Sequence, residues 1–165
     1  MGIEFVGDCL KVLSQSVLAV TPTEGCALLI GKYKESISLT QDNSIQIQMI
    51  WPCCNVWEPD KFGLVESPQK TNSAVQEKSS KENRFVIDPR EQLLAQHWAR
   101  KHHLEIVGSA HSHPSGDSIP SSVDCLWSFS PGLIVIIDQY GGARAWWMEQ
   151  SQTLHPKEVA IWSLK

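Results

Sequence analysis

Apolar side chains near the start of the chain recur at the spacing of a helix. Four of them fall three or four positions apart, namely Val6, Leu10, Leu13 and Val17. Because residues at such spacings share one helical face, the segment 3–20 is predicted to be an amphipathic helix that packs on the core. Pro22 ends the pattern, since proline cannot continue a helix.

Farther along, short apolar or alternating runs predict strands. They lie at 24–31, 36–39, 45–51, 85–87, 105–113, 133–138, 143–149 and 159–164. The run 133–138 is continuously apolar, as in a central strand, whereas 45–51 alternates apolar and polar residues, as in a strand with one wet face. Turn-forming residues at 41–44 and 141–142 join neighbouring runs and favour hairpin connections.

Two further helices are predicted, over 88–102 and 121–129. The first starts at Asp88, an N-cap residue that Pro89 and Glu91 follow at the first and third helical positions. Leu94 and Trp98, four positions apart, are expected on its buried face.

The segment 57–83 interrupts the regular pattern. It is rich in Lys, Glu, Ser, Gln and Pro and shows no sustained period, so it is predicted to be a long mobile loop or insertion. The remaining elements amount to about six or seven strands interrupted by helices. They predict one domain over 1–165 of the α/β (α+β) class, with a mixed sheet flanked by helices.

Composition and charge exclude several classes of protein. Apolar residues make up 42% and charged residues 19% of the 165 residues, which is typical of a globular domain. A net charge of −4 without a basic cluster argues against a nucleic-acid partner, and no apolar run is long enough to span a membrane. The chain does not begin with the pattern of a secretory signal, so a cytoplasmic location is expected.

The cysteines give no sign of a disulfide framework. Their number is odd, no two form a C-x-x-C pair, and they are Cys9, Cys26, Cys53, Cys54 and Cys125. This pattern also argues against a cysteine-only zinc knuckle. Free, buried thiols in a reducing compartment are therefore expected.

The stretch 111–124 carries the residues most suited to chemistry. His111 and His113 lie at i and i+2 at the end of a predicted strand, so their side chains point to one face. A Pro/Gly/Ser loop then turns the chain and brings Asp124, in the first turn of the next helix, back as a third metal ligand. Two imidazoles and a carboxylate suit zinc. Glu24, at the mouth of a buried strand, is the best-placed carboxylate for a general base.

Each of these features has an ordinary alternative. A histidine on a strand is more often structural or exposed than a ligand. Ser121-x-x-Asp124 is also a capping box that starts a helix, and Glu24 alone fits a solvated residue at a strand entrance. Four histidines lie outside the constellation, namely His97, His102, His103 and His155. The joint occurrence of the other residues at fixed spacing is what favours a metal site.

Taken together, these motifs resemble those of a known family. The His-x-His-Pro motif at 111–114, followed after six residues by Ser-x-x-Asp at 121–124, resembles the signature of the JAMM (MPN-plus, JAB/Mov34/PAD-1-like) metalloproteases. The strand at 24–31 resembles the family's upstream glutamate strand. The resemblance covers nearly the whole chain, and the length is that of the small stand-alone prokaryotic branch.

The resemblance implies a cytidine-deaminase-like JAB/MPN fold with a mixed central sheet and helices on both sides. It also implies one zinc ion per chain, held by His111, His113 and Asp124. In such a site Glu24 acts as the general base. Ser121 donates a hydrogen bond to the tetrahedral oxyanion.

The resemblance further implies a substrate class. Members of the family hydrolyse peptide or isopeptide bonds after the C-terminal Gly-Gly of ubiquitin-like proteins. In bacteria the analogous substrates are sulfur-carrier proteins, from which an amino acid such as cysteine is released. The insertion 57–83, longer than in the minimal bacterial form, is either a substrate flap or a surface loop.

The residues after Glu24 depart from the family pattern, and two other functions stay open. Glu24 is followed by Gly-Cys-Ala where many relatives have Ala-Cys-Gly. A non-catalytic MPN scaffold, which binds partners without chemistry, is the main alternative, although such scaffolds usually lack the ligands present here. A RadC-like protein is the other alternative. The oligomeric state is not predicted by the sequence.

Overall fold

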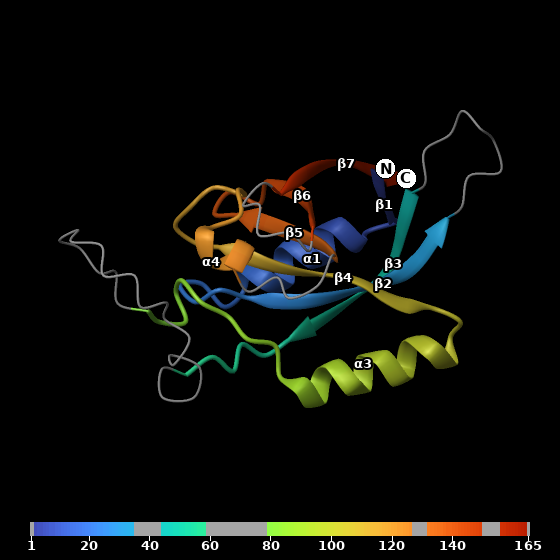
Figure 1. Ribbon diagram of the computed structural model, residues 1–165, viewed down its shortest axis with the longest axis horizontal. Coiled ribbons are helices and arrows are strands. Elements are labelled where there is room, and N and C mark those ends of the chain that lie inside the picture. The colour runs from blue at the N-terminus through green and yellow to red at the C-terminus, as the bar shows by residue number, and fades with distance from the viewer. Residues whose placement is uncertain (1, 35–43, 59–78, 127–131, 150–155, 165) are drawn as a thin grey trace.

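Figure 1 shows the computed structural model of the chain, which describes residues 2–34, 44–58, 79–126, 132–149 and 156–164. The helices are α1 (Cys9–Leu18), α3 (Pro89–Lys101) and α4 (Ser122–Leu126). The strands are β1 (Gly2–Val6), β2 (Cys26–Lys34), β3 (Ser44–Cys53), β4 (Glu105–His113), β5 (Gly132–Asp138), β6 (Ala143–Met148) and β7 (Lys157–Leu164). None of these helices is both long enough and apolar enough to cross a membrane.

The seven described strands form one mixed sheet that closes into a barrel. Their order is β1-β3-β2-β4-β5-β6-β7, and β1 also pairs with β7. The β1–β3, β1–β7 and β4–β5 pairs are parallel, and the other pairs are antiparallel. The predicted α/β class with a mixed sheet is confirmed, whereas the closure through β1 is not visible in the local sequence pattern.

The segment predicted as one helix over 3–20 divides into a strand and a helix, so that prediction is wrong for its first residues. Ile3 and Phe5, two positions apart, are fully buried in β1, whereas Leu13 and Val17, four positions apart, are buried on α1. The two periods are separated by Gly7, whose φ of 55° is in the left-handed region that favours glycine. Both elements bury their apolar side chains in the same core.

Alternate residues of β2 face two different helices. Ala27 and Leu29 belong to the core that includes the buried residues of α1, whereas Leu28 and Ile30 pack with α3. Figure 1 shows the sheet curving around α1 and α3 lying on its outer side. Because side chains alternate along a strand, β2 is covered on both faces, and the predicted flanking helices are confirmed.

Helix α3 begins as predicted but packs through other residues. Asp88 caps it by accepting a hydrogen bond of 2.9 Å from the backbone N–H two residues on. The fully buried residues are Ala95 and Ala99, with Trp98 packed partly buried beside them, whereas Leu94 is 62% exposed. The prediction of Leu94 on the buried face is therefore wrong, because small alanines make the contact with the sheet.

The predicted strand 85–87 is also absent from the described elements. Ile87 forms only an isolated bridge with Asn55. Residues 59–78 of the predicted insertion lie outside the described part of the chain, as does the strand predicted at 36–39. The ends of the insertion belong to the folded body, since Trp57 is only 3% exposed and Asn83 is half-buried.

The last elements follow the prediction closely. The strands expected at 105–113, 133–138, 143–149 and 159–164 correspond to β4, β5, β6 and β7. The helix expected over 121–129 is present as α4, and residues 127–131 lie outside the described part. Between β4 and α4 the chain turns at 114–120, and this turn positions the candidate site.

Candidate metal centre

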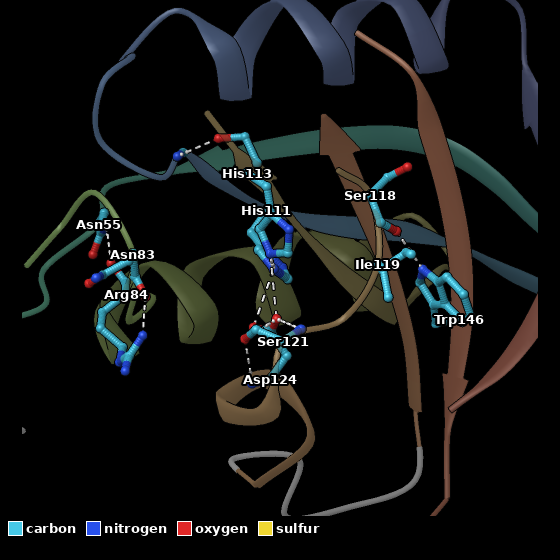
Figure 2. A network of polar contacts seen from close by, with 12 residues as sticks. Asn55, Asn83, Arg84, His111, His113, Ser118, Ile119, Ser121, Asp124 and Trp146 are labelled. Carbon is cyan, nitrogen blue, oxygen red and sulfur yellow. Dashed lines mark hydrogen bonds and ion pairs between the residues drawn. The ribbon is translucent and has the colours of Figure 1, made fainter. Parts of the chain in front are cut away.

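The structure brings His111, His113 and Asp124 together at the end of β4. The Nε2 atoms of the two histidines lie 3.1 Å apart. Asp124, from the first turn of α4, places Oδ1 at 3.3 Å from Nε2 of His111 and Oδ2 at 3.5 Å from Nε2 of His113. One donor atom from each residue falls within 4.8 Å of the others, and Figure 2 shows the three side chains pointing toward one another.

The separations of these donors fit a zinc ion. With metal–ligand bonds of about 2.0–2.1 Å, two ligands of a tetrahedral zinc site lie about 3.3–3.4 Å apart. The 3.1 Å between the two Nε2 atoms and the 3.3 Å from Oδ1 of Asp124 to Nε2 of His111 are close to that value, and the donor atoms of all three residues lie within 4.8 Å of one another. A cation at the centre would satisfy the facing lone pairs of two imidazoles and a carboxylate at once.

Each histidine ring is oriented by a neighbour outside the triad. Nδ1 of His113 lies 2.7 Å from the carbonyl oxygen of Asp117, and because a carbonyl can only accept, Nδ1 carries the proton and Nε2 keeps its lone pair for a metal. The fully buried ring of His111 stacks on Phe85, with 4.5 Å between centroids and 24° between planes. The segment predicted as strand 85–87 thus contributes a packing partner to the site.

Asp124 is held in place by Ser121. The backbone N–H and the hydroxyl of Ser121 both donate to Oδ2 of Asp124, each at 2.7 Å. Oδ1 is therefore the carboxylate oxygen better placed to bind a metal. The capping arrangement and the approach of Asp124 to the histidines occur together, so the two interpretations of Ser121-x-x-Asp124 are compatible.

The charges of the triad support one another. Burial alone would raise the pKa of Asp124, but the imidazole of His111, together with contacts from His113 and Ser121, holds that pKa well below its ordinary value. Burial also disfavours the imidazolium of His113, yet its contacts with Asp124 and the carbonyl of Asp117 raise the pKa of His113. Asp124 therefore stays ionised, as a metal ligand must be.

Glu24 lies in the same pocket as Asp124, at the start of β2. It is buried, and burial raises the pKa of Glu24 to about 8, with His113 lowering it and Asp124 raising it further. Its backbone is fixed, since its N–H donates to the carbonyl of Lys81 at 2.7 Å. A cation held by the triad would lower this pKa, as a nearby positive charge favours the carboxylate.

Similarity to known proteins agrees with this geometry. Residues 8–149 match the family of prokaryotic homologs of the JAB domain. The chain belongs to this family. One relative of this JAB domain is the desampylase of Pyrococcus furiosus, with 30% identity over 81 residues. That match covers 47% of this chain and 56% of the desampylase, so it spans little more than half of the relative's length.

Solved structures share the fold of this JAB domain. A protein of Desulfitobacterium hafniense superposes with a TM-score of 0.73 at 19% identity, over 99% of this chain and 93% of that one. A protein of Salinibacter ruber has a TM-score of 0.55 at 21% identity, over 96% of this chain and 90% of that one. A JAB1/MPN domain protein of Archaeoglobus fulgidus has a TM-score of 0.50 at 13% identity, over 99% of this chain and 98% of that one. The predicted JAB/MPN fold is thereby confirmed.

The JAB domain also contains a buried linkage that the sequence alone did not reveal. Ser112, between the two histidines, points away from them. Its Oγ accepts a hydrogen bond from the N–H of Gly25 at 2.9 Å and donates one to the carbonyl of Val17 at 3.1 Å. The N–H of Ser112 donates to the carbonyl of Gly25 at 3.0 Å. The histidine strand is thus tied to the residue next to Glu24.

A second contact, from Trp146 on β6, fixes the loop 114–120 of the JAB domain. Nε1 of Trp146 donates to the carbonyl of Ser118 at 2.9 Å, and both residues are buried. The guanidinium of Arg144 lies 4.6 Å from the centre of the Trp146 ring and makes two contacts of 2.8 Å with Glu158. Figure 2 shows Trp146 directed at Ser118, on the opposite side of the ligands from Arg84.

Proposed function

We propose that this JAB domain is a zinc-dependent hydrolase that cleaves an amide or isopeptide bond at the C-terminal tail of a ubiquitin-like or sulfur-carrier protein. The observation that carries the proposal is the convergence of His111, His113 and Asp124 at separations of 3.1–3.5 Å, with buried Glu24 in the same pocket. A site built only for protein binding has no need of two facing imidazoles beside a buried carboxylate.

In the proposed reaction, zinc supplies a Lewis acid that polarises the scissile carbonyl and makes water acidic. Glu24 accepts the proton of the attacking water and passes it to the leaving amine. Burial raises the proton affinity of Glu24 and a cation held by the triad would lower it, and these opposing effects suit a carboxyl that serves first as base and then as acid. The products are a carboxylate on the tail and a free amine.

Ser121 is proposed to donate to the oxyanion. In the structure its hydroxyl donates to Oδ2 of Asp124, so this role requires the hydroxyl hydrogen to rotate toward the substrate. The backbone N–H of Ser121 makes its own 2.7 Å hydrogen bond to Oδ2, and it would keep the carboxylate in place during that rotation.

The substrate class rests on two lines of support. The likeness to a desampylase favours a ubiquitin-like modifier as the protein partner. A net charge of −4 does not favour a nucleic acid. We therefore propose a small folded protein with an extended C-terminal tail as the substrate, and zinc as the single bound metal.

The metal centre is tested by zinc content. Purified protein is expected to hold about one zinc per chain, removable by a chelator and restored on addition of zinc. Asp124→Asn has nearly the same shape but offers a neutral amide, so it is expected to lose the zinc while keeping the circular dichroism of the fold. A wild-type protein that takes up no zinc even when zinc is added would rule out the centre.

The reaction is tested with sulfur-carrier and ubiquitin-like fusions that carry a blocked Gly-Gly tail, analysed by mass spectrometry. Glu24→Gln is expected to keep the zinc and to lower turnover by about 10²–10⁴-fold, as for loss of a general base. Glu105→Gln, an exposed glutamate at the far end of β4, is the matched control and should cleave normally. Zinc binding without cleavage of any fusion would favour the non-catalytic scaffold instead.

A further inference from the structure

The pocket beside the metal ligands has a distinct charge distribution. It has a volume of about 550 Å³ and includes Glu24 and Asp124 at the reactive end. Beyond them its lining includes apolar residues of β4 and β5, such as Ile106 and Ile134. Arg84 is the one Lys, Arg or His among its described lining residues. A pocket of this size accepts a short peptide segment, and a single cation in it would select for an anionic group.

The guanidinium of Arg84 has donors to spare. Among the described residues its one hydrogen bond runs from Nη1 to the carbonyl of Asn83, at 2.5 Å. A guanidinium carries five N–H donors, and its planar fork matches a carboxylate. By contrast, two other arginines direct guanidinium N–H donors at carboxylates of the protein itself. Arg90 contacts Asp88, and Arg144 contacts Glu158.

Arg84 lies on the side of the site where the amine must leave. Arg84 and Glu24 line the same pocket, and the side-chain amide of Asn55 donates to the backbone carbonyls of both, at 2.9 Å and 3.0 Å respectively. In the proposed reaction Glu24 hands the proton to the leaving nitrogen, so that nitrogen is beside Glu24. Figure 2 shows Arg84 at one side of the ligands, and Ser118 and Trp146 at the other.

We propose that Arg84 is a specificity residue that binds a carboxylate carried by the leaving amine. The inference rests on the proposed hydrolase function and narrows its substrate class. In an amino acid joined through its α-nitrogen, the carboxylate is separated from that nitrogen only by Cα. In a lysine isopeptide no carboxylate lies near the leaving nitrogen. The pocket therefore favours release of a C-terminal amino acid over release of a lysine side chain.

The bond changes are those of simple hydrolysis. Water oxygen joins the carbonyl carbon of the tail, the C–N bond breaks, and the proton taken by Glu24 goes to the nitrogen. Arg84 takes no part in these steps. It holds the carboxylate of the departing amino acid, so its contribution appears in substrate affinity and in the choice between substrates.

The test compares matched tail peptides that end in Gly-Gly-Ala, one with a free α-carboxylate and one with a C-terminal carboxamide. The zinc-loaded wild-type chain is expected to prefer the free acid in kcat/KM by about 10–100-fold, the range for a hydrogen bond to a charged group. In Arg84→Gln the KM for the acid should rise by the same factor, whereas the carboxamide should be cleaved as before. Arg100→Gln, exposed on α3, is the matched control and should keep the preference.

Binding is measured separately from turnover. Glu24→Gln, which keeps Arg84, is titrated with both peptides by calorimetry, and Glu24→Gln combined with Arg84→Gln is titrated in the same way. Tighter binding of the acid that disappears in the double variant supports the proposal. Equal binding of the two peptides to Glu24→Gln overturns it, whether or not the wild type cleaves either peptide.

Two kinetic results would also overturn the role of Arg84. One is equal kcat/KM of the wild type for the acid and the carboxamide. The other is a fall in kcat of Arg84→Gln for both peptides alike, which would mean that Arg84 acts through Glu24. If zinc-loaded wild type cleaves neither these peptides nor the protein fusions, the hydrolase function fails, and the calorimetric comparison still decides whether Arg84 binds a carboxylate.

Discussion

Replacing Ser112 by alanine removes a buried hydroxyl that joins three segments of the JAB domain. Ser112 is fully buried, and its Oγ connects the N–H of Gly25 to the carbonyl of Val17 at the end of α1. Alanine leaves the rest of the strand unchanged. Among the described residues the substitution therefore leaves one buried donor and one buried acceptor without the partner they have in the wild type.

The expected loss of stability follows from these two groups. A buried polar group left unpaired costs about 1–3 kcal/mol. The two unpaired groups together would cost about 2–6 kcal/mol. Part of this cost is recovered, because alanine has no polar group that needs a partner, so the free energy of unfolding should fall by about 2–4 kcal/mol. For a domain of this size that corresponds to a melting temperature lower by about 4–16 °C.

The assay is urea unfolding of chelator-treated protein, since bound zinc would add its own stabilisation. Ser16→Ala is the matched control. The hydroxyl of Ser16 also donates to a helical carbonyl, that of Val12, but in a solvent-accessible place where water can replace it. Ser16→Ala should change the free energy of unfolding by no more than about 0.5 kcal/mol. A loss below about 1 kcal/mol in Ser112→Ala would refute the reasoning.

Two further predictions concern the surroundings of the site. Trp146→Phe keeps an aromatic ring but removes the N–H that donates to the carbonyl of Ser118. It should weaken zinc affinity by about 10–100-fold, measured in competition with a chromogenic chelator. Unchanged affinity would show that the metal site does not need this hydrogen bond to the loop 114–120. Burial raises the pKa of both Cys26 and Cys53 to about 12, so these thiols should resist iodoacetamide near pH 8, whereas exposed Cys54 is alkylated first in peptide mass maps. Equal labelling of Cys26 and Cys54 would contradict the burial of Cys26.

The core of the site could be predicted because its geometry is local. His111 and His113 are two positions apart on a strand, and a two-residue period alone turns both rings to one face. Asp124 follows after one short loop, and its place in the first turn of a helix is encoded by the Ser-x-x-Asp pattern. Glu24 was placed by strand context, and the structure brings it to the same pocket as Asp124.

The residues that orient these groups could not be predicted in the same way. Phe85 has the apolar neighbours of a short strand, and only the tertiary fold brings its ring onto His111. Strand alternation turns Ser112 away from the two histidines, but its partners Gly25 and Val17 come from the other end of the chain. Nothing within a few residues of Ser112 indicates these contacts.

The errors in the fold arose where two patterns compete. Val6, Leu13 and Val17 fit a helix, and this spacing concealed the two-residue alternation of Ile3 and Phe5 in β1. Because β1 pairs only with strands distant in sequence, its neighbours could not correct the assignment. On α3 the larger apolar residues were taken as the buried face, although the close approach to the sheet is made by alanines.

The position of β1 has a consequence for folding during synthesis. β1 is made first among the described strands, but its partners β3 and β7 arise in the middle and at the end. The ribosome adds about 5–20 residues per second, so the roughly 150 residues between β1 and β7 keep the nascent sheet open for about 8–30 seconds. In that interval the unpaired edges of β1 and β6 are exposed to other chains. The growing chain is therefore most prone to mispairing just before β7 appears and joins both edges.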